Sequence, residues 1–574
     1  MYKVTGVTPT SMFIEVVDVD AYQQQDDAKK LSIGSFIKVS DHKALTVLAI
    51  VQSFRIKDAV VTTEGVEPTQ AVFVIEAQPV GSFDNEEFRR GGQQIAIPPT
   101  DVEVATTEDL KKIYGGIEVE KQFKFGKMVQ DPNVSVIVDG DKFFGKHIGV
   151  VGSTGSGKSC TVAKLIQEGI KASDGQAQAG VLNNSHVLIF DVHGEYASAF
   201  PTARKITVDN LILPYWLMNS EELEEMFIES QEANSHNQIS QFKFAVTLNK
   251  QRHNETLEKL NYDTPVFFSI EEIHRYIRNH SCATKDAKTR VLAIKERVPD
   301  LDEKYQLFES IEFEDKSTGK INGGPYEGEF DRFASRLETK LNDDRLAFLL
   351  CPKKPNGDTY STDDLGEIIR QFTGYIHEHE SNVTIIDLSG IPFEVLSIVV
   401  SLITRLIFDF CFYFRKPKPN NEEIPFMLVF EEAHRYVPRT EASRYNSVKK
   451  SIERVAKEGR KYGISLMIIS QRPSEISETI FSQCNNFVAM RLTNPADQQY
   501  IKRLLPDSVS AITDSLPILE KREAIVIGDS ISVPSWVTID EITDKPDSND
   551  INFHTEWKKN WMEIAFDEVI NRLK

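Results

Sequence analysis

The first part of the chain alternates short β-rich runs with turn residues. The runs that predict strands are Met12–Val17, Ser35–Val39, Ala44–Val51 and Ala71–Glu76. Several short strands at this spacing are typical of a small barrel. We therefore predict a small β-barrel over residues 1–110. It has no cluster of catalytic residue types, so we interpret it as a structural or adaptor domain.

From about residue 140 the pattern changes to apolar runs, each followed by a stretch of helical periodicity. This alternation is typical of an α/β domain with a parallel sheet. Fully apolar runs predict strands that are buried on both faces. These runs are His147–Val151, His186–Asp191, Phe426–Phe430 and Ile464–Ser470.

A charged, helical pattern covers residues 215–370, interrupted by the loop-like stretch Lys316–Pro325. We interpret it as a helical insertion that divides the α/β core into residues 111–214 and 371–540. Arg415–Asn421 is rich in proline and charge, which favours an exposed connector. Residues 541–574 form a tail that is first acidic and then predicts an amphipathic helix containing Trp557, Trp561, Ile564 and Ile570.

The composition indicates the class of protein and its cellular compartment. A chain of 574 residues with 40% apolar and 26% charged residues is an ordinary soluble protein of three or four domains. The cysteines have no paired short spacing, which argues against a disulfide framework or a zinc site. The N-terminus lacks the pattern of a signal peptide, and Val395–Thr404 is too short to span a bilayer. We expect a cytoplasmic protein with no membrane partner.

The net charge of −20 comes from 66 basic and 86 acidic residues. Such a balance argues against a surface that is basic overall and coated for nucleic-acid binding. It leaves room for phosphate-contacting groups that are concentrated in one channel or loop.

The segment Gly152–Ser159 reads GSTGSGKS and fits the phosphate-binding P-loop pattern. Its glycines let successive N–H groups point at phosphate oxygens, and the following helix adds the positive end of its dipole. Lys158 would reach the β- and γ-phosphates, and the Ser159 hydroxyl would bind Mg²⁺. A flexible Gly/Ser linker is disfavoured by the strand before it and the helix after it. The predicted ATP-binding residues are Gly152, Ser153, Thr154, Gly155, Ser156, Gly157, Lys158, Ser159 and Cys160.

Two carboxylates, Glu431 and Glu432, follow an apolar strand directly. The carboxyl ends of strands are where α/β proteins bind ligands. A P-loop enzyme needs one acid for the Mg²⁺ water shell and a second to orient or deprotonate the attacking water. We assign Glu431 to the metal and Glu432 to the water. The alternative is a strand that ends in a solvated acidic turn.

Polar Gln471 follows the strand Ile464–Ser470, at a position suited to sensing the γ-phosphate. A glutamine that only bonds its own turn is the alternative. The helical segment Ser451–Gly463 is basic and carries Arg460 near its end. Such a helix is most often a solvated surface with Glu pairs, and the functional alternative is an arginine finger that enters a neighbouring subunit's site.

Taken in order, six segments of the chain resemble the HerA family of DNA-translocating ATPases, which is related to FtsK. The β-rich N-terminus is similar to the HerA barrel domain, and the resemblance continues from about residue 130 to 540. A P-loop alone is common to many families, whereas the ordered set is specific. The segments are Gly152–Ser159, Asp191–Tyr196, Leu213–Leu217, Glu431–His434, Glu458–Gly463 and Ser470–Pro473.

The resemblance implies a hexameric ring with a RecA-like P-loop core, a small N-terminal β-barrel, a helical insertion and ATP sites between subunits. It implies that Arg460 is the trans-acting finger, with Arg454 and Lys146 as lesser candidates. Lys146 is a departure, because a bidentate arginine is expected before the P-loop strand. Asp191 and Glu195 are expected to line the site, although Asp191 is equally suited to capping the strand end.

Contact with DNA is predicted for the segment that follows the acidic pair. It offers Arg439, Arg444, Lys449 and Lys450, with the aromatic Tyr445 among them. In a ring this loop would face the channel and bind phosphates. An ordinary surface loop is the alternative.

The leading hypothesis is a homohexameric, Mg²⁺-dependent ATPase that moves double-stranded DNA through its central channel. By the resemblance it would work with an effector docked on the N-terminal barrel. That effector would be a NurA-like nuclease, or a sirtuin-like or nuclease subunit in anti-phage defence. The rival hypothesis is an ATP-regulated ring scaffold that assembles and activates such an effector. A secretion or conjugation ATPase is less favoured, because no membrane segment is predicted.

Overall fold

The computed structural model describes most of the chain. The described ranges are residues 2–8, 10–24, 31–41, 46–57, 72–84, 87–91, 100–171, 182–229, 235–375, 380–416, 423–439, 446–504, 513–548 and 551–573.

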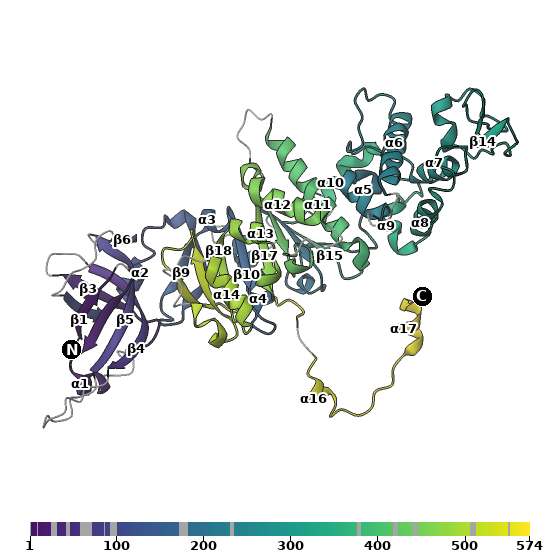
Figure 1. The fold of residues 1–574 in the computed structure, drawn as a ribbon. Helices are drawn as coiled ribbons and strands as arrows, with labels where there is room; N and C mark the ends of the chain where they lie inside the picture. The colour runs from purple at the N-terminus through teal and green to yellow at the C-terminus, as the bar shows by residue number, and fades with distance from the viewer. Residues whose placement is uncertain are drawn as a thin grey trace, which may run out of the picture.

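The N-terminal part is an antiparallel sheet of seven strands (Figure 1). Hydrogen bonding follows the order β1-β2-β5-β4-β3-β7, with β6 paired to β5. Buried apolar side chains such as Met12, Ile14 and Val16 alternate with partly exposed ones and form its apolar core. The strands are β1 Tyr2–Val7, β2 Met12–Val16, β3 Phe36–Asp41, β4 Thr46–Lys57, β5 Val72–Asp84, β6 Glu87–Arg90 and β7 Thr100–Val104.

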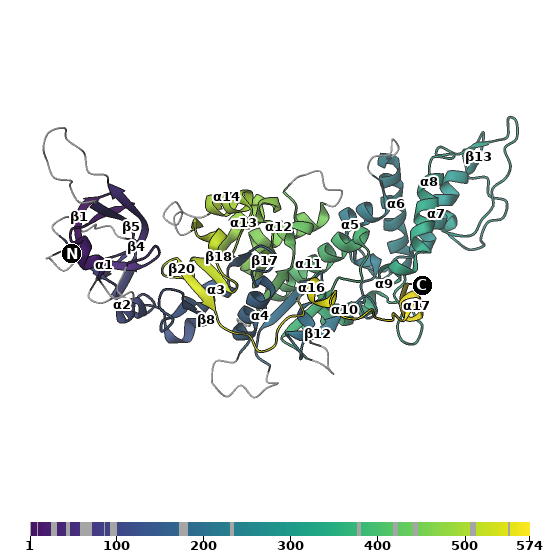
Figure 2. The ribbon, with the colours of Figure 1, turned by 90° about the horizontal axis from the view of Figure 1, so that it is seen from below.

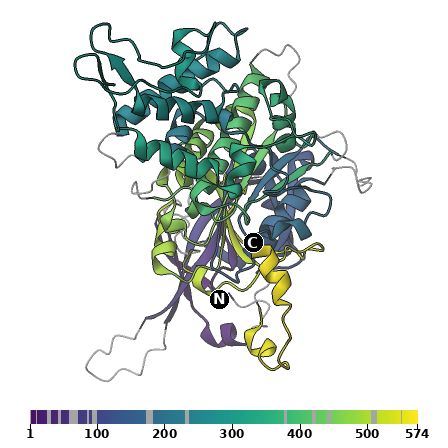
Figure 3. The same ribbon diagram turned by 90° about the vertical axis from the view of Figure 1, so that its right-hand side faces the viewer.

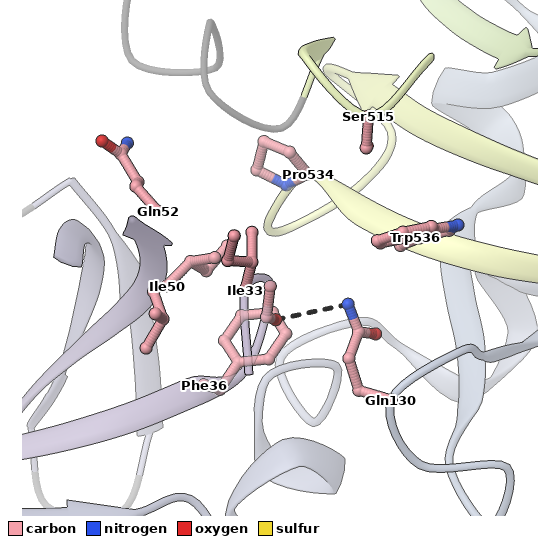
Figure 4. Close-up of a pocket in the computed structure, with 10 residues that line it drawn as sticks. Ile33, Phe36, Ile50, Gln52, Gln130, Ser515, Pro534 and Trp536 are labelled. Carbon is pink, nitrogen blue, oxygen red and sulfur yellow. Dashed lines mark hydrogen bonds between the residues drawn. The ribbon is translucent and has the colours of Figure 1, made fainter. Parts of the chain in front are cut away.

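This sheet packs against the central part of the molecule. Phe36 and Ile50 belong to the same apolar cluster as Met128. The Arg90 guanidinium donates to the Gly528 carbonyl at 3.0 Å. Beside this contact, Phe36 and Ile50 face Pro534 and Trp536 across a small pocket (Figure 4). The joint is therefore an apolar contact with a few backbone-directed hydrogen bonds at its edge.

The central part is built on a sheet of eleven strands in the order β12-β15-β11-β16-β17-β10-β18-β19-β20-β8-β9. Neighbours from β12 to β18 are parallel, and those from β18 to β9 are antiparallel. The predicted α/β fold is confirmed, and all four predicted strands are adjacent in the parallel half. The strands are β8 Gln122–Met128, β9 Ser135–Asp139, β10 His147–Val151, β11 His186–Asp191, β12 Arg204–Ile206, β15 Val383–Asp387, β16 Phe426–Phe430, β17 Ile464–Ser470, β18 Cys484–Met490, β19 Glu523–Gly528 and β20 Ser535–Ile539.

Helices cover both faces of this sheet. Alternate residues of a strand point to opposite faces, so Ile148 and Val150 lie in one apolar cluster and Val151 lies in the other. Helix α4 packs into the first cluster, whereas α11 and α12 pack into the second (Figure 2). The helices around the sheet are α2 Thr107–Lys112, α3 Gly140–Phe144, α4 Lys158–Gly169, α11 Phe393–Arg415, α12 Ser447–Glu458, α13 Glu478–Gln483 and α14 Pro495–Leu504.

Helix α11 corrects one prediction. The apolar stretch that was expected to end at Thr404 continues to Arg415, so the helix has 23 residues and is long and apolar enough to cross a membrane. Most of it, 78% of the apolar window, is buried inside the protein. Arg405 forms an ion pair at 2.8 Å with the fully buried Glu222. These contacts are those of a central core helix.

The described residues between β12 and β15 form six α-helices. Of these, α6, α7 and α8 lie at the end of the molecule opposite the N-terminal sheet, whereas α5 and α10 pack against α11 (Figures 1 and 2). The stretch that was expected to be loop-like contains β14, which pairs with β13 in a small two-stranded sheet. The elements are α5 Ser220–Phe227, α6 Ser235–His253, α7 Ile270–Cys282, β13 Thr284–Asp286, β14 Ile321–Gly323, α8 Asp331–Leu341, α9 Ala347–Leu350 and α10 Leu365–Thr373.

The C-terminal tail extends away from the body of the molecule (Figures 1 and 3). The single amphipathic helix expected there is wrong. Two short helices form instead, α16 Phe553–Glu556 and α17 Phe566–Leu573, and Trp561 lies between them. Trp557 and Trp561 are 77% and 98% exposed. Without a surface to pack against, the apolar side chains supply no tertiary contacts to stabilise a longer helix.

Candidate functional site

The predicted P-loop connects β10 to α4 at the carboxyl end of the parallel strands. Gly157 has a φ of 95°, which favours glycine, and the loop turns there into the first helical residue, Lys158. A Cβ on Gly152 would lie 2.7 Å from Ser156 Oγ, so the tight start of the loop also requires glycine. The first-turn N–H groups of α4 have no partner within the helix and point into the loop. The loop has the shape of a phosphate cradle.

Neighbouring strands hold this loop in place. Gly152 N donates to the Ser470 carbonyl of β17 at 3.2 Å. Ser153 N donates to the Arg491 carbonyl, which follows β18, at 2.8 Å. The Ser153 hydroxyl lies 3.2 Å from that of Thr493. The cradle therefore rests on the two strands that flank β10.

The two predicted acids, Glu431 and Glu432, are both buried at the carboxyl end of β16. Glu432 has a φ of 45°, in the left-handed region that a residue with a side chain rarely adopts. Such strain persists where the surrounding structure imposes it, and it turns the Glu432 carboxylate toward the cleft.

Gln471 connects the cradle to Glu432. Its amide Nε2 donates to Glu432 Oε1, and its Oε1 accepts a hydrogen bond of 2.6 Å from the Thr154 hydroxyl. His434 Nδ1 lies 3.2 Å from Glu432 Oε2. Burial raises the pKa of Glu432, but His434, Lys158 and Gln471 outweigh it and leave that pKa below its usual range. Glu432 is thus an ionised acceptor held in a fixed orientation.

The environment of Glu431 shifts its pKa in the opposite direction. Burial, with the charges of Asp191 and Glu195, raises the pKa of Glu431 to about 9. Its Oε2 accepts a hydrogen bond of 3.2 Å from Val192 N. The adjacent acids therefore have pKa values shifted in opposite directions, an arrangement common at catalytic sites.

Asp191 forms a cap at the end of β11. Its two carboxylate oxygens accept hydrogen bonds from the backbone N–H groups of His193, Gly194, Glu195 and Tyr196, at 2.8 to 3.3 Å. Of the two roles considered for Asp191, this geometry supports the cap. The turn that it holds places Glu195 in the lining of the same cleft as Ser159.

Lys158 is 8% exposed and lies among these acids. Burial lowers the pKa of its ammonium, and Glu432, Glu431 and Glu195 partly offset that effect. An ammonium held at the floor of the cradle gives an incoming polyphosphate a partly desolvated cation, which interacts more strongly than an exposed one.

The cradle and the acids share one cleft of about 620 Å³. The residues present fit a Mg²⁺-bound nucleotide, because the buried hydroxyls of Ser156 and Thr161 have no partner among the described residues. Within the described ranges no group of three or more His, Cys, Asp or Glu forms a self-contained metal site. Mg²⁺ keeps several of its waters and needs only one or two protein ligands.

Comparisons with known proteins agree with this geometry. Residues 123–326 match the family described as "Helicase HerA, central domain". The probable DNA double-strand break repair helicase HerA of Methanocaldococcus jannaschii is 25% identical over 97% of this chain and 98% of its own length. The chain is therefore similar to HerA proteins along most of its length. The HerA of Saccharolobus solfataricus is 27% identical over 81% of this chain and 77% of its own.

Two solved structures are similar to this chain at low sequence identity. VirB4 of Thermoanaerobacter pseudethanolicus has a TM-score of 0.47 at 14% identity, over 74% of this chain and 98% of its own. The bacterial conjugative coupling protein TrwB has a TM-score of 0.44 at 12% identity, over 78% of this chain and 94% of its own. With its P-loop, paired acids and HerA relatives, the chain is a P-loop ATP hydrolase.

Arg460 does not join the other predicted catalytic residues in this cleft. It lies in the turn before Ile464, where β17 begins, whereas the P-loop contacts Ser470, where β17 ends. Its guanidinium is exposed and donates to Asn485 Oδ1 at 3.4 Å. The lesser candidates are also outside the cleft. Lys146 pairs with Asp529 at 2.6 Å, and Arg454 lies 4.3 Å from the centre of the Phe408 ring.

The predicted DNA contacts lie on both sides of residues 440–445, and Arg444 falls outside the described residues. Arg439 forms an ion pair with Glu478. Lys450 forms one with Glu221 at 2.7 Å, and Lys449 lies beside it on α12. All the described members of this set are on the same side of the sheet as α12.

Sequence reasoning missed several groups that line the cleft. Lys521, Arg522 and parts of residues 540–548 come from the far end of the chain. No local motif marks them, since they reach the P-loop only through the antiparallel half of the sheet. His434 belongs to the segment Glu431–His434 named in the sequence analysis, but its contact with Glu432 was not predicted.

Proposed function

We propose that this chain is a Mg²⁺-dependent ATPase that assembles into a homohexamer and translocates on double-stranded DNA. One observation carries the proposal. The cleft of a single chain holds the phosphate cradle and the Glu432–Gln471 pair, whereas Arg460 is exposed at the opposite end of β17. Seven strand residues, at roughly 3.3 Å each, separate the two ends by about 20 Å. Arg460 can therefore complete only the cleft of another copy.

The proposal also assigns a role to each part of the fold. We assign the parallel half of the large sheet to a RecA-like core, the N-terminal sheet to a HerA-type barrel, and α5–α10 to a helical insertion in that core. The exposed apolar tail, with Trp561 98% exposed, supports an assembly in which a neighbouring copy covers it. We place the assembly in the cytoplasm.

The chain's own residues divide the catalytic work. Lys158 and the first-turn N–H groups of α4 bind the polyphosphate, and Ser159 with Glu431 would hold the metal. When bound, Mg²⁺ would neutralise charge on the phosphate oxygens. Glu432 orients and deprotonates the attacking water, and Gln471 reports the state of the γ-phosphate because it bonds both Thr154 and Glu432. Arg460 of the next subunit stabilises charge on the transferred group.

Duplex DNA would be bound through its phosphates by basic groups of each subunit, with little base specificity. Arg439, Arg444, Lys449 and Lys450 are the proposed contacts. The pairing of Arg439 with Glu478 and of Lys450 with Glu221 means that binding must exchange these carboxylates for phosphates. The net charge of −20 would repel DNA from the rest of the surface.

An effector subunit, a nuclease or a sirtuin-like enzyme, would dock on the N-terminal sheet. That sheet lies at the end of the molecule away from α5–α10 and is joined to the core by a limited contact (Figure 1). A role in DNA-end processing or in anti-phage defence depends on which effector binds.

The test is ATP turnover by the full chain with and without linear duplex DNA, combined with its mass in solution. We expect a hexamer whose turnover rises with duplex DNA and whose DNA affinity falls steeply with salt. A monomeric ATPase, or one indifferent to DNA with no ATP-driven movement on it, would contradict the proposal.

A further inference from the structure

The segment that follows β20 runs along the open side of the nucleotide cleft. We call Asp540–Ser548 the strap. Six of its nine residues line the same cleft as Lys158 and Ser159. They are Asp540, Glu541, Ile542, Lys545, Pro546 and Ser548.

Helix α4 holds the strap on one side through backbone-directed hydrogen bonds. Lys164 Nζ donates to the Glu541 carbonyl at 3.1 Å, and Gln167 Nε2 donates to the Asp544 carbonyl at 3.1 Å. Both donors lie on the helix that begins in the phosphate cradle. The strap is thus held in a fixed position relative to the cradle.

The turn after β11 holds the strap on its other side. Asp547 N donates to the Glu195 carbonyl at 2.9 Å, and the Ser198 hydroxyl donates to the Lys545 carbonyl at 2.9 Å. The side chain of the same Glu195 lines the cleft together with Ser159 of the cradle. Strap, turn and cradle therefore form one connected frame.

Arg522 fastens the start of the strap to the P-loop. Its backbone is left-handed, with a φ of 72°, and its N–H donates to the Ser156 carbonyl at 3.1 Å. Its guanidinium donates to the Ile539 carbonyl at 2.8 Å and to the Glu541 carboxylate at 2.8 Å. One residue thus joins the cradle and the strap.

The position of the phosphates determines what the strap can contact. With the polyphosphate at Lys158 and Ser159, the ribose and base must leave the cradle along the part of the cleft lined by Cys160, Thr161 and the strap. Ile542 packs against the apolar cluster beneath α4 and remains partly exposed in the cleft, whereas Pro546 is buried. Ile542 therefore gives the strap a fixed apolar surface in the cleft, which suits a planar base.

We infer that the strap is the wall against which the nucleobase of ATP packs, and that Ile542 determines nucleotide affinity. The inference rests on the proposed function only in that the cleft binds ATP. Inorganic triphosphate carries the phosphates without a base. Changes in the strap should therefore weaken ATP and leave inorganic triphosphate unaffected.

The experiment compares Ile542→Asn with Thr543→Asn in the full chain. Thr543 is the next residue of the strap, is exposed and does not line the cleft, so it is a matched control. By calorimetry we expect Ile542→Asn to weaken ATP about tenfold through loss of apolar contact, with triphosphate affinity changed less than about twofold. Thr543→Asn should bind both ligands as the unaltered chain does.

A second variant, Ser198→Ala, loosens the strap without touching the cleft lining. It should weaken ATP by a few-fold and again spare triphosphate, and its thermal unfolding midpoint establishes that it is folded. Equal loss of ATP and triphosphate affinity in Ile542→Asn, or unchanged ATP affinity in both variants, would overturn the inference. DNA-stimulated turnover is measured separately. Its absence would reject translocation and leave the base wall intact.

Discussion

Gln471 donates its side-chain amide to the carboxylate of Glu432 while its own carbonyl oxygen accepts the hydroxyl of Thr154. The glutamine that follows β17 therefore touches both the acid after β16 and the crest of the P-loop. Thr154 and Gln471 line the same cleft as Lys158. In the proposed role of Gln471 as a γ-phosphate sensor, an entering γ-phosphate would compete for these bonds and change the contacts of Glu432.

Gln471→Glu should lower ATP turnover about a hundredfold with little effect on nucleotide affinity. The substitution keeps the shape but puts a second carboxylate beside Glu432, which removes the donor and adds repulsion. Steady-state turnover and equilibrium binding of ATP measure the two effects. Turnover close to that of the unaltered chain would show that the Gln471–Glu432 bond has no part in hydrolysis.

Lys158→Ala and Glu432→Gln should both abolish hydrolysis for different reasons. The first removes the cation that binds the phosphates, so ATP affinity should fall. The second keeps the cradle and removes the group that activates water, so ATP should stay bound and unhydrolysed. Gel filtration with ATP, followed by analysis of the bound nucleotide, separates the outcomes. If Glu432→Gln turns over ATP normally, another residue activates the water.

Arg460→Ala should reduce turnover by about a thousandfold while nucleotide affinity stays nearly unchanged. The loss is expected because Arg460 lies at the opposite end of β17 from its own cradle. Mixing this variant with Lys158→Ala subunits should restore part of the activity, since some interfaces then combine an intact cradle with an intact arginine. Arg454→Ala is the matched control. No recovery in any mixture would exclude a finger that acts in trans.

Protonation of His147 should contribute to loss of stability in acid. Its Nε2 donates to the Ala456 carbonyl at 2.9 Å and its Nδ1 accepts from Leu466 N at 3.0 Å, so the buried ring is neutral. Burial lowers the pKa of His147 to about 4 from an ordinary 6.5. Between about pH 4 and 6.5, His147 is therefore protonated in the unfolded chain and neutral in the folded chain. The stability from this group is complete above pH 6.5 and falls as the pH approaches 4, by up to about 3 kcal/mol.

His147→Gln measures that contribution. The variant should be less stable than the unaltered chain at pH 7.5, because a tight buried pair of hydrogen bonds is disturbed. The difference should shrink by pH 5, since the variant has no imidazole to protonate. Urea unfolding at both pH values gives the two free energies. A difference that stays constant with pH would contradict the assignment.

Asp191→Asn should lower the free energy of unfolding by about 2–3 kcal/mol. One of its oxygens would be replaced by an amide that faces the backbone N–H groups now bonded to the carboxylate. The Glu195 turn would loosen with it, so ATP turnover should also fall. Asp387, which caps β15 nearby, offers a control as Asp387→Asn. Equal effects of both changes on turnover would show a general loss of stability.

Local pattern was enough for much of the site. A buried strand, a glycine-rich turn and a helix in sequence define the P-loop, because one short segment supplies both the shape and the charge. Glu431, Glu432 and Gln471 could be predicted since each directly follows an apolar strand, and parallel strands end at a common edge. Of the described strands of the central sheet, β10, β11, β16 and β17 were predicted. The strands β8, β9, β12, β15, β18, β19 and β20 were not, although β8 and β18 have seven residues each.

Other features depended on contacts between distant segments. The full length of α11 and the failure of the tail to form one helix follow from what each packs against, which periodicity alone does not report. The cap formed by Asp191 became clear only from the four N–H groups around it.

By itself the sequence determined that this is a P-loop ATPase of α/β fold with HerA-like motifs, since these properties are encoded in short contiguous segments. The tertiary structure decided that Arg460 is outside its own cleft, that Gln471 joins Thr154 to Glu432, and that the strap borders the nucleotide cleft. Each of these depends on distances between groups far apart in the chain, and those distances are set by how the strands order and the layers pack.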